Sequence, residues 1–268
     1  MNELEKRMVG LLAEMKQKYH VIAVKAEFEA EGTRMVEAMR LKDVASMAGL
    51  PLNIKIGGCE AIKDMLDTIG LGAERIIGPM IETPYALQKF IRAAQMVFGK
   101  NFNEVQILAN IETITACENF PAMLEIPEIK HLSGIVIGRV DFVGSLGMPR
   151  DSINSAKILT YATDLARQAK EHGMQVVVGG GVSVDSIPFF QAFPTGHLDR
   201  FETRKVIFSC PEAINNPEEA FIKAVEFELL WLKNKREYYG AISREDNARI
   251  EMMEKRYQAS LEKVRATD

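Results

Sequence analysis

Residues 105–147 read VQILANIETITACENFPAMLEIPEIKHLSGIVIGRVDFVGSLG. Two β-branched runs, within residues 105–113 and 133–142, enclose a segment long enough for one helix, so the stretch predicts a strand, a helix and a second strand. Strands joined by a crossover helix lie parallel in the same sheet. We therefore expect a parallel sheet covered by helices.

The same alternation continues on both sides of this stretch. Five further β-rich runs are present, and they begin at Val21, Pro51, Arg75, Gln175 and Leu198. From Pro84 to Phe98, apolar residues recur at the three-and-four spacing of a helix with one buried face. Seven strands with helices between them fit a TIM (β/α)8-type barrel with one strand undetected, or an open doubly wound sheet.

Charged residues at the strand ends favour the barrel. They follow nearly every predicted strand, and they are Glu27, Glu29, Lys55, Glu82, Glu112, Asp141, Glu202 and Arg204. In a barrel every parallel strand ends at one shared mouth, whereas an open sheet concentrates functional residues at its switch point. The fold class that we expect is therefore α/β, a TIM-type barrel.

The two ends of the chain are predicted to be helical. We expect residues 1–210 to form the barrel with an amphipathic N-terminal helix, and residues 211–268 to form a C-terminal helical extension. The extension reads as one helix from Pro217 to Tyr239 and, after Gly240, a second from Ser243 to about Lys263. Apolar residues around much of the first helix predict a homo-oligomer interface.

Composition limits the partners. The formal net charge is −4, which gives no field that would attract nucleic acid or an anionic membrane. The three cysteines are widely spaced and contain no C-x-x-C pair, so a reducing, cytoplasmic location is expected. No stretch has the roughly 20 apolar residues that a membrane-spanning helix needs. A small molecule is the expected partner.

Glu112 and Asp141 are the sharpest candidates for a functional site. Each follows a β-branched run, and a carboxylate there is hard to bury unless it is paired or bound to a cation. Mg²⁺ and Mn²⁺ take oxygen ligands and are often fixed by one or two carboxylates. The residues alone leave a second interpretation open, in which both acids cap helices.

Three motifs in order, PMIET (79–83), NIET (110–113) and SGIVIGRVDFVGSLG (133–147), resemble the HpcH/HpaI aldolase and citrate lyase beta-subunit-like family. The resemblance implies a pyruvate-kinase-like barrel of the phosphoenolpyruvate/pyruvate superfamily. It also implies a lyase that uses Mg²⁺ or Mn²⁺ to break or form a carbon–carbon bond beside a pyruvate-like or acyl-CoA enolate. By this resemblance Glu112 and Asp141 are the metal ligands, and the substrate carboxylate lies beside Gly144, Ser145 and Leu146.

The sequence departs from the family pattern at positions that carry chemistry. Lys55 stands where family members usually have an arginine that stabilises the oxyanion. The segment after the first strand has no histidine to act as a base, so Glu27 or Glu29 is the candidate for proton transfer if burial raises its pKa. Arg139 either binds a substrate carboxylate or phosphate, or forms a surface ion pair.

Other charged residues leave alternatives open. Arg204 shares one strand face with Glu202, and this pair either binds an anionic substrate or forms a buried ion network. Lys25 and Lys55 face the barrel interior, where a lysine can form a Schiff base or pair with glutamates. The glycines of residues 179–181 either cradle a phosphate or form a tight turn.

Three functions follow from these features. The first is a metal-dependent carbon–carbon lyase or aldolase that acts on a 2-keto acid or a related carboxylate. The second is an acyl-CoA ester lyase or thioesterase of the citrate lyase type. The third is a binding or assembly subunit without catalysis.

Overall fold

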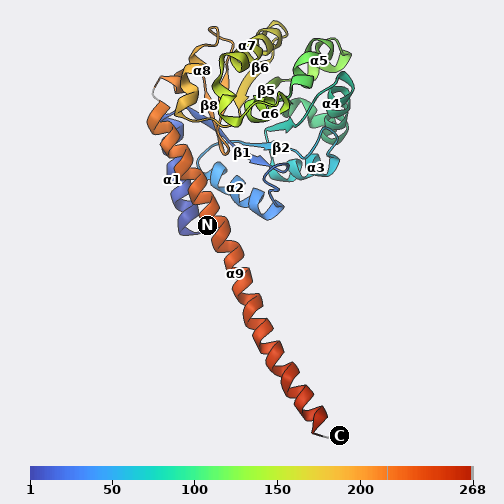
Figure 1. The fold of residues 1–268 in the computed structure, drawn as a ribbon, viewed down its shortest axis with the longest axis vertical. Helices are drawn as coiled ribbons and strands as arrows, with labels where there is room; N and C mark the ends of the chain where they lie inside the picture. The colour runs from blue at the N-terminus through green and yellow to red at the C-terminus, as the bar shows by residue number, and fades with distance from the viewer. Residues whose placement is uncertain (216, 267–268) are drawn as a thin grey trace.

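The computed structural model describes residues 1–215 and 217–266, and within them eight strands close into a barrel in sequence order (Figure 1). The strands are β1 (Val21–Glu27), β2 (Leu52–Lys55), β3 (Arg75–Gly78), β4 (Gln106–Ile111), β5 (Gly134–Gly138), β6 (Gln175–Gly179), β7 (Arg200–Glu202) and β8 (Val206–Ser209). The predicted α/β barrel is therefore confirmed. Strands β1 to β7 pair in parallel, which brings their C-terminal ends to one mouth.

Helices surround the strands on the outside of the barrel (Figure 1). They are α1 (Glu3–Lys18), α2 (Met35–Met47), α3 (Ile62–Leu71), α4 (Pro84–Phe98), α5 (Ile114–Leu124), α6 (Arg139–Ser145), α7 (Ala156–Glu171), α8 (Ile187–Gln191) and α9 (Pro217–Arg265). Short 3-10 turns are η1 (Gly99–Glu104), η2 (Pro127–His131), η3 (Arg150–Asn154), η4 (Val184–Ser186) and η5 (Glu212–Ile214). The predicted helix over residues 84–98 is α4 itself, capped by the Thr83 hydroxyl.

The undetected strand lies inside a predicted one. Residues 198–208 read as a single strand, but the structure divides them into β7 and the antiparallel β8, which closes the barrel against β1. The turn between them is held by Thr203, whose N–H donates to the carbonyl of Val206 and whose hydroxyl accepts from the Val206 N–H. The continuous β-branched pattern hid this hairpin, because nothing in residues 203–205 is a strong turn residue.

The interior of the barrel is layered. Ile77, Leu108, Val136 and Val177 form a small apolar cluster separate from the main core, which lies between the strands and the helices. Towards the strand ends the inward positions become charged, with Lys25 and Glu27 on β1 and Lys55 on β2 all buried. The apolar layer thus forms the base beneath a polar mouth.

The C-terminal segment is one helix, not two. Helix α9 continues through Gly240, so the predicted break there is wrong. A helical glycine costs only about 1 kcal/mol relative to alanine, which good helix formers on both sides offset. The domain boundary near residue 210 stays a prediction, and Thr267 and Asp268, at the end of the predicted extension, lie outside the described residues.

The first half of α9 packs antiparallel against α1 (Figure 1). Lys223 pairs with Glu14 at 3.4 Å, and Asn234 accepts a hydrogen bond from Asn2 at 2.7 Å. Farther along, Tyr239 donates to Glu37 in the first turn of α2, near the barrel mouth. Residues 241–260 are exposed, and this half of α9 projects away from the barrel.

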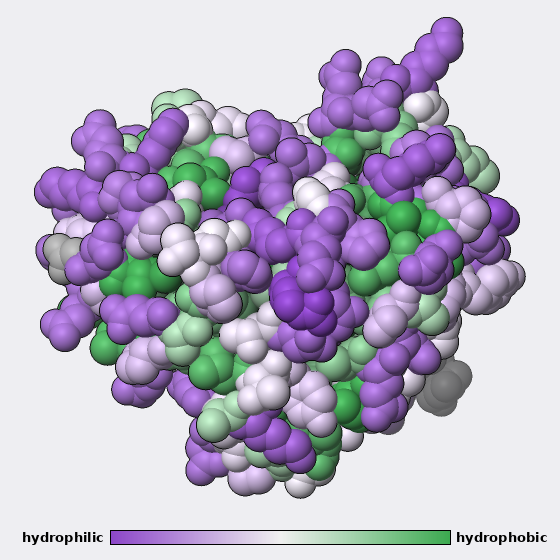
Figure 2. Space-filling model, turned by 90° about the horizontal axis from the view of Figure 1, so that it is seen from above, coloured by the Kyte–Doolittle hydropathy of each residue, from purple (hydrophilic) through white to green (hydrophobic). Residues whose placement is uncertain are grey.

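The remaining surface is mixed in character. Seen from above, hydrophilic side chains separate several hydrophobic patches (Figure 2). Within residues 1–215 and 217–266, none of the helices combines the length and the apolar character that crossing a bilayer requires.

Candidate active site

A cavity of about 760 Å³ opens at the C-terminal ends of the strands. Its wall includes residues on or directly after β1, β2, β4, β5, β6 and β7, together with the first turns of α9. Glu112 and Asp141 both line it, as do Lys55, Glu27, Glu29 and Arg204. The barrel therefore brings most of the predicted site residues to one place.

Glu112 lies at the base of this cavity, directly after β4, and its side chain is buried. Its Oε1 accepts the Met80 N–H at 3.0 Å, and its Oε2 accepts from the Asn110 side-chain amide at 2.6 Å. Met80 has a φ of 48°, a left-handed conformation that is uncommon for a non-glycine residue. A Cβ at Gly138 would stand 2.6 Å from Oε2, so only glycine leaves room for this carboxylate. The strand ends thus fix its position.

Lys55 is shared between two carboxylates. Its Nζ lies 2.9 Å from Oε2 of Glu29 and 3.4 Å from Oε2 of Glu112. Burial alone would lower the pKa of Lys55, but the attraction of Glu112 and Glu29 outweighs it and raises the pKa. The ammonium is thus kept charged, which disfavours the Schiff-base alternative because that chemistry needs a neutral amine.

Lys25 forms a second buried ion cluster with Glu202 and Glu27, at 2.6 and 2.9 Å. Burial opposes its charge, yet Glu202 and Glu27 raise its pKa above the ordinary value. In turn, burial would raise the pKa of Glu27, but Lys25 more than compensates and lowers it. The sequence left Glu27 as a candidate base on the condition that burial raises its pKa, and the effect of burial is outweighed here by Lys25, a partner that the sequence did not reveal.

Asp141 differs from Glu112 in its setting. Strand β5 ends at Gly138, four residues earlier than predicted, so Asp141 lies in the first turn of α6 and is exposed. No hydrogen bond or ion pair engages its side chain among residues 1–215 and 217–266. Its carboxylate is free to accept a ligand within the cavity.

The carboxylates that line the cavity, Glu112 and Asp141 among them, supply the oxygen donors that a divalent cation takes. The inner wall carries four carboxylates, Glu27, Glu29, Glu112 and Glu202, against the two ammonium groups of Lys25 and Lys55. Lys55 can separate from Glu112 and keep its ion pair with Glu29, because its Nζ lies closer to Glu29 than to Glu112. In the described part of the chain no group of three or more His, Cys, Asp and Glu side chains is placed to hold a metal ion, so water and substrate would complete the ligand set.

A family model confirms the resemblance seen in the motifs. The model of the HpcH/HpaI aldolase/citrate lyase family matches residues 38–183, more than half of the chain. The chain belongs to this family. Members are lyases and aldolases that act on small carboxylates. The matched segment contains Lys55, Glu112, Arg139 and Asp141, while Glu27, Glu29 and the whole of α9 lie outside it.

Solved structures of HpcH/HpaI proteins share the fold. An HpcH/HpaI aldolase from Desulfitobacterium hafniense DCB-2 aligns with a TM-score of 0.58 and 16% identity over 71% of this chain and 79% of its own. The citrate synthase SbnG aligns with a TM-score of 0.58 and 15% identity over 73% and 81%. A family protein from Burkholderia cenocepacia J2315 gives 0.53 and 16% over 72% and 90%. No curated protein sequence matches this HpcH/HpaI chain.

Arg139 of this HpcH/HpaI protein faces away from the cavity. Its side chain is fully buried and donates to the carbonyls of Gly179 and Gly180 and to the hydroxyl of Ser186. The guanidinium also lies over the ring of Phe189, 4.8 Å from its centroid. Desolvation lowers the pKa of Arg139 to about 10. It forms neither a surface ion pair nor part of the cavity wall, and instead it joins α6 to the glycine loop.

The glycine loop forms a turn that lines the cavity. Gly180 and Gly181 have φ values of 80° and 64°, and a Cβ on Gly180 would lie 2.7 Å from the Val140 nitrogen. The loop therefore packs directly on the start of α6. Its glycines are needed for this close approach.

Of the remaining residues predicted to bind substrate, one lines the cavity and three do not. Gly144, Ser145 and Leu146 are absent from the cavity wall, and the Ser145 hydroxyl instead accepts the Ile114 N–H and donates to the Phe142 carbonyl. Arg204 lines the cavity and is exposed, with Glu228 at 3.5 Å and Glu31 at 3.7 Å. Arg204 and Glu202, which the sequence placed on one strand face, have different partners, because Glu202 pairs with Lys25 inside the barrel.

Several cavity residues were not predicted from the sequence. They are Asn110, Arg150, Val182, Val184, Ile222 and Val225. Asn110 could have been found from its place two residues before Glu112 on the same strand face. The contribution of α9 could not, because nothing local indicates that a helix after the last strand borders the mouth.

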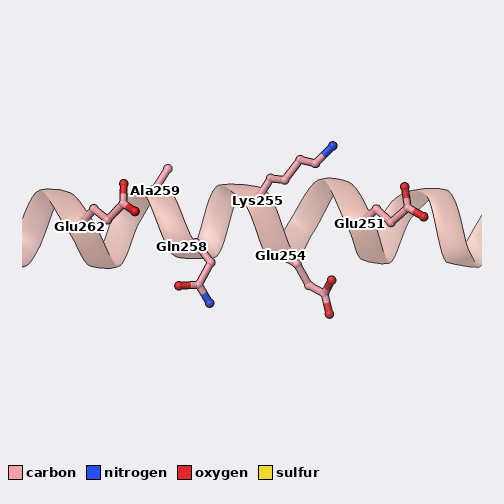
Figure 3. Close-up of a pocket in the computed structure, with 6 residues that line it drawn as sticks. All are labelled: Glu251, Glu254, Lys255, Gln258, Ala259 and Glu262. Carbon is pink, nitrogen blue, oxygen red and sulfur yellow. The ribbon is translucent and has the colours of Figure 1, made fainter.

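A second concavity lies on the projecting half of α9. Figure 3 shows its residues, Glu251, Glu254, Lys255, Gln258, Ala259 and Glu262, on a single helix with side chains directed to different sides. One exposed helix encloses no ligand, so the barrel mouth is the candidate active site.

Proposed function

We propose that this HpcH/HpaI family member is a divalent-metal-dependent carbon–carbon lyase that acts on a 2-keto acid in the barrel mouth. The observation that supports this most is that Glu112 and Asp141 line one cavity whose inner wall has more carboxylates than ammonium groups. Both positions also match the metal-ligand motifs of the family.

Glu112 and Asp141 would hold Mg²⁺ or Mn²⁺, since both ions prefer carboxylate oxygens. The bound cation would supply Lewis-acid stabilisation of the negative charge that develops when the carbon–carbon bond breaks. The neutral Asn110 oxygen beside Glu112 has no hydrogen-bond partner and is buried, so it offers a further polar contact at the same point.

Lys55 would stabilise the developing oxyanion with a charge that its carboxylate neighbours maintain. Glu29 is the better candidate for proton transfer. Its side chain is half-buried, and among the described residues its ion pair is with Lys55, whereas Glu27 is tied to Lys25 by a 2.9 Å ion pair. A proton moved by Glu29 would therefore leave the Lys25 cluster intact.

A second function, the acyl-CoA ester lyase or thioesterase, is supported by the size of the cavity. A volume of about 760 Å³ suits a drug-sized molecule and exceeds what pyruvate fills. Competition between acetyl-CoA and pyruvate for the site separates the two functions.

We also propose that the chain forms a homo-oligomer through the projecting half of α9. Ile250, Met253 and Tyr257 are more than half exposed there and recur at the spacing of a coiled-coil seam. The apolar residues that suggested an interface earlier in the helix are mostly used within the chain, since Phe221, Phe227, Leu230 and Trp231 are buried. A cytoplasmic location remains a prediction.

Exchange of the pyruvate methyl protons in D₂O, followed by ¹H NMR, tests the proposed lyase. Protein treated with EDTA should lose exchange, and added Mg²⁺ or Mn²⁺ should restore it. The Asp141→Asn protein should show little exchange with either ion. Exchange that is unaffected by EDTA, or absent under all conditions, would contradict the proposal.

A further inference from the structure

The wall of the cavity is divided into a charged part and an apolar part. The charged part comes from β1, β2 and β4 and carries Lys25, Glu27, Lys55 and Glu112. The apolar part comes from the loop after β6 and from α9, and it carries Val182, Val184, Ile222 and Val225. Val184, Ile222 and Val225 are 42%, 66% and 67% exposed, so their side chains are open to a ligand.

Helix geometry explains why α9 presents this surface. Ile222 and Val225 are one turn apart and lie on the same side of the helix. Phe221 and Ala224, beside them in the sequence, are buried against the barrel and hold this part of α9 in place. Phe221 packs against Phe201 and Phe208, with ring centroids 5.7 and 6.1 Å apart. The apolar wall is therefore fixed to the strands rather than carried by a free helix.

The charged residues at the rim of the cavity balance one another, so the rim has no net attraction for an anionic ligand. Arg150 and Arg204 line the rim, but Asp185 and Glu228 line it too, and Glu228 lies 3.5 Å from Arg204. These four groups carry no net charge. A ligand that ends in a second carboxylate would find no excess of positive charge at the rim to attract it. That carboxylate would instead lie against valine and isoleucine side chains.

We infer that the substrate is a 4-hydroxy-2-keto acid with an apolar substituent on C4, so that the aldehyde product or co-substrate is hydrophobic. The inference rests on the proposed lyase function, which places the keto acid at the charged wall. In cleavage the C3–C4 bond breaks, the C4 hydroxyl loses its proton and becomes the aldehyde, and the electron pair passes to the pyruvate enolate, which is then protonated. Condensation is the exact reverse, and no other reactant is needed.

The test is aldol condensation of pyruvate, with Mg²⁺ or Mn²⁺ present, with acetaldehyde, butanal and hexanal, and with succinic semialdehyde as the charged counterpart of butanal. A methylene that leaves water entirely contributes about 0.8 kcal/mol, or about a fourfold change. We expect kcat/KM to rise about two- to fourfold per methylene, and butanal to exceed succinic semialdehyde at least tenfold.

Two variants on α9 make the test specific. Val225→Asp should flatten the dependence of kcat/KM on the chain length of the aldehyde. Leu232→Asp is the matched control, because Leu232 is also exposed on α9 but lies outside the cavity wall, and it should keep the slope.

The outcomes separate this inference from the lyase proposal. Methyl exchange without a chain-length slope, or a preference for succinic semialdehyde, would overturn the hydrophobic-aldehyde inference alone. A slope that persists in Val225→Asp would also overturn it. Absence of methyl exchange would overturn both.

Discussion

The Nζ atom of Lys55 lies 3.4 Å from Oε2 of Glu112. The distance is longer than the 2.9 Å that separates Lys55 from Glu29, so the lysine is held mainly by Glu29. Glu112 has no other cation beside it among the described residues. This geometry is compatible with the metal ion proposed at Glu112, because Lys55 keeps the closer carboxylate of Glu29 as its partner.

Replacement of Glu112 with glutamine should abolish metal-dependent chemistry. The change removes the negative charge at nearly the same side-chain size, so we expect Mg²⁺ or Mn²⁺ affinity to fall by about 100-fold or more and methyl exchange to be lost. Isothermal titration calorimetry measures the affinity. Glu118→Gln, an exposed change on α5 after the same strand, is the control and should behave like the unmodified chain. Unchanged affinity in Glu112→Gln would exclude this carboxylate as a ligand.

Replacement of Lys55 with methionine should affect metal binding and chemistry in opposite directions. The ammonium competes with a cation for Glu112, so its removal should strengthen Mn²⁺ binding several-fold. It should also slow methyl exchange by about 100-fold or more, because one oxyanion-stabilising group is lost. If exchange and affinity both fall, Lys55 instead holds the site in shape. Titration calorimetry and NMR exchange on the same preparation decide between these results.

The local patterns around each strand carried most of the fold information. The three-and-four apolar spacing over residues 84–98 predicted α4 to the residue, and β-branched runs located every parallel strand. The hairpin of β7 and β8 was missed because its turn has no glycine or proline. The break at Gly240 was wrong because one glycine does not outweigh helix formers on both sides.

The sequence located the candidate site but not the pairing within it. Spacing placed Glu112 and Asp141 one strand–helix–strand step apart, and both line the cavity. It could not show that Lys25 joins Glu27 to Glu202, since 177 positions separate Lys25 from Glu202. It also could not show that Arg139 turns into the core. Such contacts are fixed by barrel closure, which brings distant segments together.

Replacement of Lys25 with methionine should lower the free energy of unfolding more at neutral pH than at acidic pH. Partners raise the pKa of Lys25, so its contribution is complete below the unfolded value near 10.4 and is lost only at more alkaline pH. The lowered pKa of Glu27 gives stability above about pH 4.3, lost as the pH falls through the folded value. Without Lys25, two buried carboxylates lack a partner.

We therefore expect Lys25→Met to cost about 3–5 kcal/mol of unfolding free energy at pH 7 and clearly less at pH 4.5, because burial without Lys25 raises the pKa of Glu27 and lets it lose its charge. Urea unfolding at the two pH values measures this. Lys63→Met, which removes an exposed pair with Asp67, should change stability by less than about 0.5 kcal/mol at either pH. A cost that does not shrink at pH 4.5 would show that the carboxylates find other partners.

Replacement of Arg139 with methionine should destabilise the barrel. The side chain is fully buried, and its loss leaves the carbonyls of Gly179 and Gly180 without their donor. We expect a cost of about 2–4 kcal/mol from these unsatisfied groups. Arg92→Met, which removes an exposed pair with Glu128, is the control and should cost less than about 1 kcal/mol. Urea unfolding at pH 7 measures both, and equal costs would contradict a buried role for Arg139.

Removal of the segment after Gly240 should separate self-association from folding. Residues 241–260 are exposed and make no packing contact with the barrel, so we expect the truncated chain to keep its unfolding temperature within a few degrees at equal subunit concentration. If Ile250, Met253 and Tyr257 form a seam with a second copy, the mass in solution should fall to that of a smaller assembly, as measured by light scattering. The double variant Ile250→Glu with Tyr257→Glu should give the same mass change without shortening the helix. An unchanged mass in both proteins would place any self-association elsewhere on the chain, because neither would retain the apolar seam.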